Sequence, residues 1–230
     1  MLILGIETSA KAVSAALMKD GELLARSSQR SGLTHSRTLL PMVMDLLKNT
    51  ETPKESVDAV AVSVGPGSFT GIRIGVSTAK GLCWGLDKPA FGVSTLEAMA
   101  YLCDFLPEGT VICPAMDARR SQVYNALFTV RQGGVARLTP DRAVSLDELT
   151  AELSGIKADI WVLGDGWKLC HDALAQAGSP HTVAPEHLRY QDAWSVCRAA
   201  EHAAPVGAEE LLPVYLRLSQ AERERQERMK

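Results

Sequence analysis

Polar residues that directly follow apolar runs are the first candidates for chemistry in this chain. Glu7, Thr8 and Ser9 follow the first apolar run, and Asp117 follows a similar run near mid-chain. In two-lobed α/β proteins, the strand ends that face the crevice carry the ligand groups. Hydroxyls and backbone N–H groups at positions 8 and 9 suit a phosphate. The same residues also suit a plain turn, because Thr and Ser commonly bond their own backbone.

A glycine-rich run between an apolar segment and a helical pattern is the second candidate. It contains Gly65, Gly67 and Gly71, but no lysine follows Gly71 as in a phosphate-binding Walker loop, and Thr70 stands where the dinucleotide fingerprint needs glycine. A helix N-terminus there still attracts anions. Alternatively, the glycines permit a tight turn and close backbone packing. Arg73 lies in the first turn of the predicted helix, where a positive charge is unfavourable with respect to the helix dipole. We therefore expect its guanidinium to have either a partner or solvent around it.

A shorter glycine signal, Gly164-Asp165-Gly166, follows an apolar run in the second half. Two glycines there let a flat ring or a phosphate approach the backbone, and a plain turn explains them equally well.

The histidines give no metal-binding pattern. None forms H-E-x-x-H or H-x-x-x-H, and the adjacent Cys170 and His171 point about 100° apart on a helix. No G-x-S-x-G elbow supports a serine triad. We therefore expect no metal site among the histidines, which are His35, His171, His181, His187 and His202.

Composition excludes several protein classes. The 230 residues include 24 basic and 27 acidic ones, a net charge of −3, so this chain is not expected to be the main surface for an RNA partner. No apolar run of 18 residues exists, so no membrane span is expected. The N-terminus lacks the features of a secretory signal. The five cysteines lie far apart without C-x-x-C, which indicates reduced, buried thiols in a cytoplasmic protein.

The elements that position these residues repeat in order. In the first half, strands over 2–6, 13–18 and 22–28 precede a helix around 39–47, a strand over 57–64 and a helix over 71–85. In the second, strands over 110–116 and 122–130 and a third after Gly133-Gly134 precede a helix over 146–153, a strand over 159–163 and a helix over 167–177. This duplicated βββαβα order predicts two α/β lobes with a cleft between them.

The proline- and glycine-containing segment after residue 104 is the predicted boundary. We expect an N-terminal lobe over residues 1–104, a smaller lobe over 105–216, which includes a helix over 193–203, and a charged tail over 217–230. The tail holds five basic and three acidic residues, which is typical of a solvated or disordered end.

The helix around residues 39–47 is apolar on more than one face. Leu39, Leu40, Val43, Met44 and Leu47 form one face, and a second stripe lies at residues 42 and 46. A helix of this kind is often buried both in its own core and against a partner. Its N-cap is expected one turn earlier at Thr34, and the proline at 41 predicts a kink or a late start.

Four segments together resemble one protein family. They are G-I-E-T-S at 5–9, S-V-G-P-G-S-F-T-G-I-R-I-G at 63–75, G-V-S-T-L at 92–96 and M-D-A-R at 116–119. The chain resembles the TsaB (YeaZ) family of bacterial threonylcarbamoyladenosine synthesis, strongly over residues 1–125 and less beyond. The resemblance implies a two-lobed fold like those of actin, Hsp70 and sugar kinases, which is ribonuclease H-like.

The resemblance also implies partners. In this family the chain acts beside a catalytic paralogue, TsaD, and an ATPase, TsaE. Together they transfer a threonylcarbamoyl group from its adenylate to N6 of the adenosine next to the anticodon of tRNA. The paralogue carries a metal-binding H-x-x-x-H where this chain has Thr95 and Met99, with Glu97 between them. Thr and Met lack the imidazole nitrogens of such a site. The resemblance thus implies a non-catalytic subunit and argues against a metalloprotease.

In the family, two helices of the first lobe pair with those of the partner in a four-helix bundle. The resemblance implies contact residues on these helices and a homodimer when the chain is alone. Nucleotide (ATP or ADP) is expected only at an interface of the complex, and tRNA only indirectly. A small-molecule kinase or ATPase is the alternative, resting on Glu7, Asp117 and Asp165 facing one cleft. The implied contacts are Thr38, Met42, Leu46, Val76 and Ala79.

Overall fold

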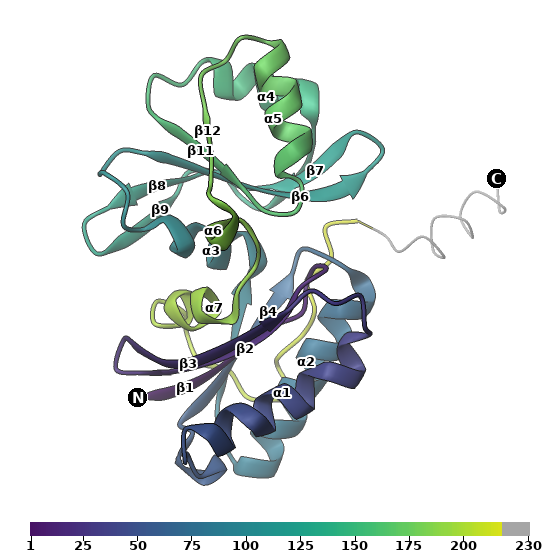
Figure 1. Cartoon of the computed structure of the whole chain (residues 1–230), viewed down its shortest axis with the longest axis vertical. Coiled ribbons are helices and arrows are strands. Elements are labelled where there is room, and N and C mark those ends of the chain that lie inside the picture. The colour runs from purple at the N-terminus through teal and green to yellow at the C-terminus, as the bar shows by residue number, and fades with distance from the viewer. Residues whose placement is uncertain (218–230) are drawn as a thin grey trace, which may run out of the picture.

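The computed structural model describes residues 1–217 of the chain, in two lobes stacked along the long axis of the molecule (Figure 1). Of the predicted charged tail, only Arg217 is described, and the rest lies outside the described residues. None of the helices within residues 1–217 combines the length and the apolar character that a bilayer crossing requires. All five cysteines are free and buried, as the sequence predicts.

The first lobe is built on a sheet whose strands have the order β3-β2-β1-β4-β5. β1, β2 and β3 are antiparallel neighbours, whereas β4 and β5 run parallel to β1. β1 and β4 are buried along their whole length, because helices cover both faces of the sheet. The strands are β1 (Leu2–Glu7), β2 (Val13–Lys19), β3 (Glu22–Gln29), β4 (Ala59–Gly65) and β5 (Ala90–Ser94).

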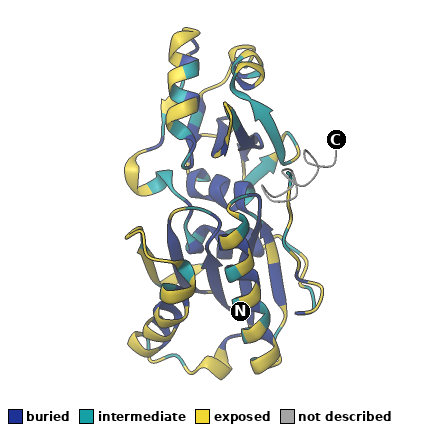
Figure 2. Ribbon diagram, turned by 90° about the vertical axis from the view of Figure 1, so that its right-hand side faces the viewer, coloured by how far each residue is buried: buried dark blue, intermediate teal, exposed yellow. Residues whose placement is uncertain are grey.

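Helices enclose this sheet. α1 (His35–Asn49) and α2 (Phe69–Leu86) lie on one face, and α7 (Ala193–Ala200) lies on the other (Figure 1). α3 (Thr95–Ala100) sits between the lobes and contacts β6 of the second lobe (Val111–Arg119) as well as α7. β1, β2 and β4 are therefore almost entirely buried, whereas the edge strand β3 and the outer faces of α1 and α2 are exposed (Figure 2).

The second lobe repeats the first sheet's topology. Its order is β10-β7-β6-β11-β12, with the same sequence of antiparallel and parallel pairings. The predicted duplication is therefore confirmed. The remaining elements are β7 (Gln122–Asn125), β8 (Phe128–Arg131), β9 (Gly134–Arg137), β10 (Arg142–Ser145), α4 (Leu146–Ser154), β11 (Ile160–Leu163), α5 (Trp167–Gln176), β12 (Thr182–Val183) and α6 (Glu186–Arg189).

Two details of the second lobe differ from the prediction. The strand predicted over 122–130 is split into β7 and β8, which pair with successive parts of the long strand β6. The strand after Gly133-Gly134 is β9, which pairs with β8 as an added hairpin. The third strand of the repeat is therefore β10, which pairs with β7.

The predicted extent of the second lobe is wrong at its C-terminal end, because residues 193–216 complete the first lobe. α7 packs on β1 and β2, the Val206 N–H donates to the Ala90 carbonyl at 2.8 Å, and the Val214 N–H donates to the Val64 carbonyl at 2.7 Å. The physical reason is that the sheet face opposite α1 and α2 is apolar. α7 removes it from water by packing on Ile3 and Phe91.

α1 begins at His35, before Pro41, so the predicted late start is wrong. The sequence left open which face of α1 packs in the core. Leu40 and Met44 are 49% and 58% exposed, so these two positions lie on the outer face. The residues that pack on the sheet are Leu39, Met42, Val43, Leu46 and Leu47.

Candidate functional site

Glu7 ends β1 inside the protein. Its side chain is 1% exposed, accepts a hydrogen bond from the Ser9 N–H at 2.5 Å, and accepts another from the Ser63 hydroxyl. Burial raises the pKa of the Glu7 carboxyl above its ordinary value, and the bonds from Ser63 and Ser9 oppose that rise. Both carboxylate oxygens are thus occupied by neighbouring protein groups, and Glu7 does not line the cleft.

Thr8 is also turned inward. Its hydroxyl donates to the Gly71 carbonyl at 2.8 Å, and its side chain is fully buried. The backbone of Ser9 meets the glycine-rich turn, because the Ser68 N–H donates to the Ser9 carbonyl at 2.7 Å. The end of β1 therefore binds the glycine run directly.

Close packing explains the glycines of this run. A Cβ at Gly67 would lie 2.4 Å from the Ser9 carbonyl oxygen, and one at Gly71 would lie 2.1 Å from the Thr8 carbonyl oxygen. Gly65 packs against the C-terminal segment instead, because a Cβ at this position would lie 2.3 Å from the Val214 carbonyl oxygen. Of the two alternatives left open by the sequence, close approach of backbones accounts for these three positions.

The C-terminal segment covers the start of α2. The Tyr215 ring stacks on Phe69 with centroids 4.5 Å apart, and its hydroxyl accepts a hydrogen bond from Arg73 Nε at 2.8 Å. Of the two alternatives that the sequence left open for Arg73, a partner or solvent, the structure shows a partner. No local sequence signal pointed to Tyr215, because the two residues lie far apart along the chain.

A cleft of about 510 Å³ separates the lobes next to this turn. Ser9 and Gly67 line it from the first lobe, and Asp117 lines it from the second. The Asp117 carboxylate accepts a hydrogen bond from the Arg119 N–H at 2.7 Å. Three predicted ligand-facing residues thus meet in one cleft, whereas Glu7, Thr8 and Gly65 lie behind it. The prediction is wrong for these last three, because packing of the glycine run on β1 encloses them.

Asp165 extends the cleft, and it lies in the Gly164-Asp165-Gly166 turn. Burial raises the pKa of Asp165, while a hydrogen bond from Gln191 Nε2 at 3.2 Å opposes the rise. A Cβ at Gly164 would lie 2.1 Å from the Ala115 carbonyl oxygen. This turn therefore packs on β6 and places one carboxylate, rather than an open glycine surface, at the cleft.

The positions that the family resemblance pairs with the paralogue's histidines lie in the core. Thr95 and Met99 are fully buried on α3, and the Met99 methyl group lies close to Gly164. A hydroxyl and a thioether there offer no imidazole nitrogen. Within residues 1–217, no group of three or more His, Cys, Asp or Glu residues could hold a metal ion.

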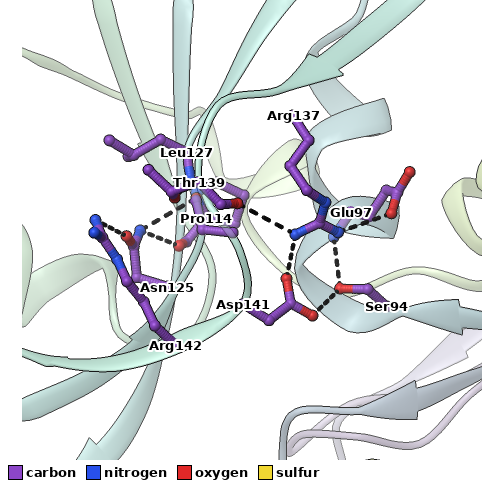
Figure 3. Close-up of polar contacts among 10 residues, drawn as sticks. Ser94, Glu97, Pro114, Asn125, Leu127, Arg137, Thr139, Asp141 and Arg142 are labelled. Atoms are coloured by element: carbon purple, nitrogen blue, oxygen red, sulfur yellow. Dashed lines mark hydrogen bonds and ion pairs between the residues drawn. The ribbon is translucent and has the colours of Figure 1, made fainter.

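Glu97, between these two positions, contacts the second lobe. Its carboxylate accepts a hydrogen bond from Arg137 Nη2 at 2.8 Å (Figure 3). Arg137 also binds Asp141, whose other oxygen accepts from the Ser94 hydroxyl at 2.6 Å (Figure 3). Glu97 therefore belongs to a network that joins α3 to the second lobe.

The predicted partner contacts divide into two groups. Val76 and Ala79 are 3% and 0% exposed and pack in the core beneath α2, so the structure offers no surface at these positions, and the prediction is wrong for them. The other three predicted contacts, Thr38, Met42 and Leu46, line a surface groove between α1 and β3. Met42 and Leu46 are only 8% and 5% exposed, because they pack on the sheet, so these two positions offer little surface to a partner. Thr38 is partly exposed.

Exposed apolar side chains on the same helices were not among the partner contacts predicted from the sequence. Leu40 and Met44 on α1 and Trp84 on α2 are 49%, 58% and 64% exposed. Their apolar character was visible in the sequence. Their exposure depends on which face of each helix packs on the sheet.

Comparison with known proteins identifies the family. The model of the family "TsaD: tRNA N6-adenosine threonylcarbamoyltransferase" matches residues 29–223. A Bacillus subtilis protein named "tRNA threonylcarbamoyladenosine biosynthesis protein TsaB" is 33% identical over 226 residues, covering 96% of each chain. The Escherichia coli protein of the same name is 34% identical over 94% of this chain and 95% of its own length.

Solved structures agree with this assignment. YeaZ from Pseudomonas aeruginosa is 28% identical, with a TM-score of 0.75 over 94% of this chain and 99% of that one. A second Pseudomonas aeruginosa structure, described as similar to the peptidase YeaZ, reaches a TM-score of 0.81 at the same identity and coverage. The predicted two-lobed α/β fold is confirmed, because these structures match it over 94% of the chain. The near-complete coverage of its relatives places the chain in the TsaB (YeaZ) family of tRNA threonylcarbamoyladenosine biosynthesis proteins.

Proposed function

We propose that this chain serves threonylcarbamoyladenosine formation in tRNA as a non-catalytic subunit that docks a TsaD-type transferase. The names of its relatives and the match to the TsaD family model support the pathway and the partner. The observation that carries the non-catalytic role is the pair Thr95 and Met99. Both are buried, and the family resemblance pairs them with metal-binding histidines of the paralogue.

The docking surface in this proposal is the outer face of α1 and α2. Both helices lie on one side of the first sheet, away from the second lobe (Figure 1). Leu40, Met44 and Trp84 expose large apolar side chains there. Burying such side chains against a partner is favourable, because it removes apolar surface from water. In the absence of the partner, the same surface favours a homodimer.

The proposal also includes an ATPase, a nucleotide and tRNA as partners. A TsaE-type ATPase joins the complex in the cytoplasm, and nucleotide binds at an interface of that complex rather than as a cofactor of this chain alone. The net charge of −3 fits a subunit that leaves most contact with tRNA to its partner.

Reconstitution tests this proposal. The purified chain, the TsaD-type protein and their mixture, each with the TsaE-type protein and ATP, are incubated with tRNA and threonylcarbamoyl adenylate, and modified adenosine is measured by mass spectrometry. We expect product only when both subunits are present. Modification by this chain in the absence of the TsaD-type protein would contradict the non-catalytic role.

The alternative function, a small-molecule kinase or ATPase, has one observation in its favour. Asp117, Asp165 and Lys11 line one cleft between the lobes. ATP hydrolysis by the isolated chain with magnesium, abolished by Asp117→Asn, would favour this alternative over the scaffold role. We expect no such hydrolysis, because the glycine run packs on β1 instead of lining an open phosphate loop.

A further inference from the structure

A second cavity opens between the lobes, beside the cleft that contains Asp117. Its volume is about 660 Å³, which is in the range of small-molecule binding sites. Lys11, Arg30 and His35 line it from the first lobe, and Tyr190 and Gln191 line it from the segment before α7. Of the residues that line this cavity, Lys11 and Asp165 also line the Asp117 cleft.

Gln191 brings an unused hydrogen-bond acceptor to this cavity. The residue is 2% exposed, and its Nε2 donates to Asp165 Oδ1 at 3.2 Å. Because a carboxylate accepts hydrogen bonds, this contact determines which end of the amide is nitrogen. Gln191 Oε1 is then a buried acceptor without a hydrogen-bond donor in the described part of the chain. Buried polar atoms in folded proteins nearly always have a hydrogen-bond partner, so Gln191 Oε1 is expected to accept from a donor that is not part of the described chain.

His35 contributes a second acceptor. Its Nε2 lies 2.7 Å from the Ala10 carbonyl oxygen. A carbonyl only accepts, so Nε2 carries the proton, and Nδ1 of the neutral ring is left with a lone pair. His35 Nδ1 is buried and also finds no donor within residues 1–217.

Positive charge lies at the rim of the same cavity. Lys11 and Arg30 are exposed, and neither forms an ion pair with another described residue. The Arg30 guanidinium lies 4.4 Å from the centroid of the Tyr190 ring, which holds it over the cavity wall. An anionic group of a ligand would find two cations there.

We propose that this cavity binds a free α-amino acid. Its ammonium group donates to Gln191 Oε1 and His35 Nδ1, and its carboxylate pairs with Lys11 and Arg30. The Asp165 carboxylate, which also lines the cavity, favours a charged ammonium over the neutral amine of a nucleobase. This binding activity goes beyond the proposed scaffold role and does not depend on it.

Calorimetric titration of the full chain with L-leucine and, separately, with L-glutamate tests the proposal. We expect saturable binding of at least one of them to a single site. The matched keto acids, 4-methyl-2-oxopentanoate and 2-oxoglutarate, lack the ammonium group and should bind about tenfold more weakly, because they lose charge-assisted hydrogen bonds. Absence of saturable binding by both amino acids, or equal binding of the keto acids, overturns the proposal, as does a preference for AMP.

Variants locate the site. Arg30→Ala removes an exposed side chain and should weaken amino-acid binding about tenfold, as should Gln191→Met, which removes the acceptor. Arg119→Ala is the matched control, because Arg119 lines only the Asp117 cleft and not this cavity. Circular dichroism checks that each variant folds. Weakening by Arg119→Ala with none from Arg30→Ala would place the ligand in the other cleft and overturn the proposal.

Discussion

Gly71 has no room for a side chain, and this makes it the sharpest stability prediction at the scale of single residues. In Gly71→Ala the new Cβ would lie 2.1 Å from a backbone oxygen of Thr8, so α2 must shift away from β1. We expect the free energy of unfolding, measured in urea, to fall by about 2–3 kcal/mol.

Gly81 on the same helix is the matched control. A Cβ there would meet nothing within 4 Å, so Gly81→Ala should stabilise the helix by about 1 kcal/mol. Equal effects of the two substitutions would show that the glycine run is not held by close packing on β1.

The burial of the Glu7 carboxyl leads us to expect that stability depends on pH. The folded state raises the pKa of this carboxyl above its ordinary value of 4.5, chiefly through burial. As pH rises through 4.5, the unfolded chain releases this proton while the folded chain retains it, so the Glu7 contribution to stability declines. The near-isosteric Glu7→Gln variant carries no such proton.

The measurement is urea unfolding of both proteins at about pH 4 and about pH 7. We expect the wild-type chain to lose stability relative to Glu7→Gln over this interval. A stability difference that stays constant with pH would mean that Glu7 ionises alike in both states.

At the scale of elements, α1 has apolar side chains both on its buried face and on its exposed face, with different roles. Met42 is 8% exposed and packs on the sheet, whereas Met44 is 58% exposed on the outer face. Substitutions at these neighbouring positions should therefore affect different properties: folding at Met42 and docking at Met44.

Met44→Lys should leave the fold intact and raise the dissociation constant for the TsaD-type partner about tenfold or more, because it places a charge in an apolar contact. Surface plasmon resonance measures the affinity. Leu138→Lys is the control, since Leu138 is 50% exposed on the second lobe. If both variants bind as the wild type does, the docking surface lies away from the exposed face of α1.

At the scale of the whole molecule, the network around Arg137 joins α3 to the second lobe. Arg137→Met leaves the carboxylates of Glu97 and Asp141 without their guanidinium partner. We expect a loss of about 1–2 kcal/mol in the free energy of unfolding, because hydrogen bonds between charged, partly buried groups are stronger than surface pairs.

Arg131→Met is the matched control for this network. Its contact with Glu108 is 3.9 Å long, and both side chains are more than half exposed, so its removal should cost less than about 0.5 kcal/mol. Thermal unfolding of the two variants gives the comparison. Similar losses of stability in both would show that the network does not help to join the lobes.

The amino-acid sequence alone determined the order of elements and their duplication. Hydrophobic periodicity and turn residues such as Gly133-Gly134 act over a few positions, so they can be read locally. The run from residue 63 to 75 also supported the resemblance to the family. Three of six expected ligand-facing residues, Ser9, Gly67 and Asp117, line the cleft because strand ends of both lobes meet there.

Only the tertiary structure decided which apolar positions of α1 are core: the sheet buries residues of both stripes and leaves Leu40 and Met44 exposed, although all of them satisfy helical periodicity. It also placed residues 193–216 on the first lobe and enclosed Glu7 and Thr8 behind the glycine run. The cavity that contains His35 and Gln191 depends on contacts between distant segments. Such contacts arise from packing between elements, which leaves no local pattern in a sequence.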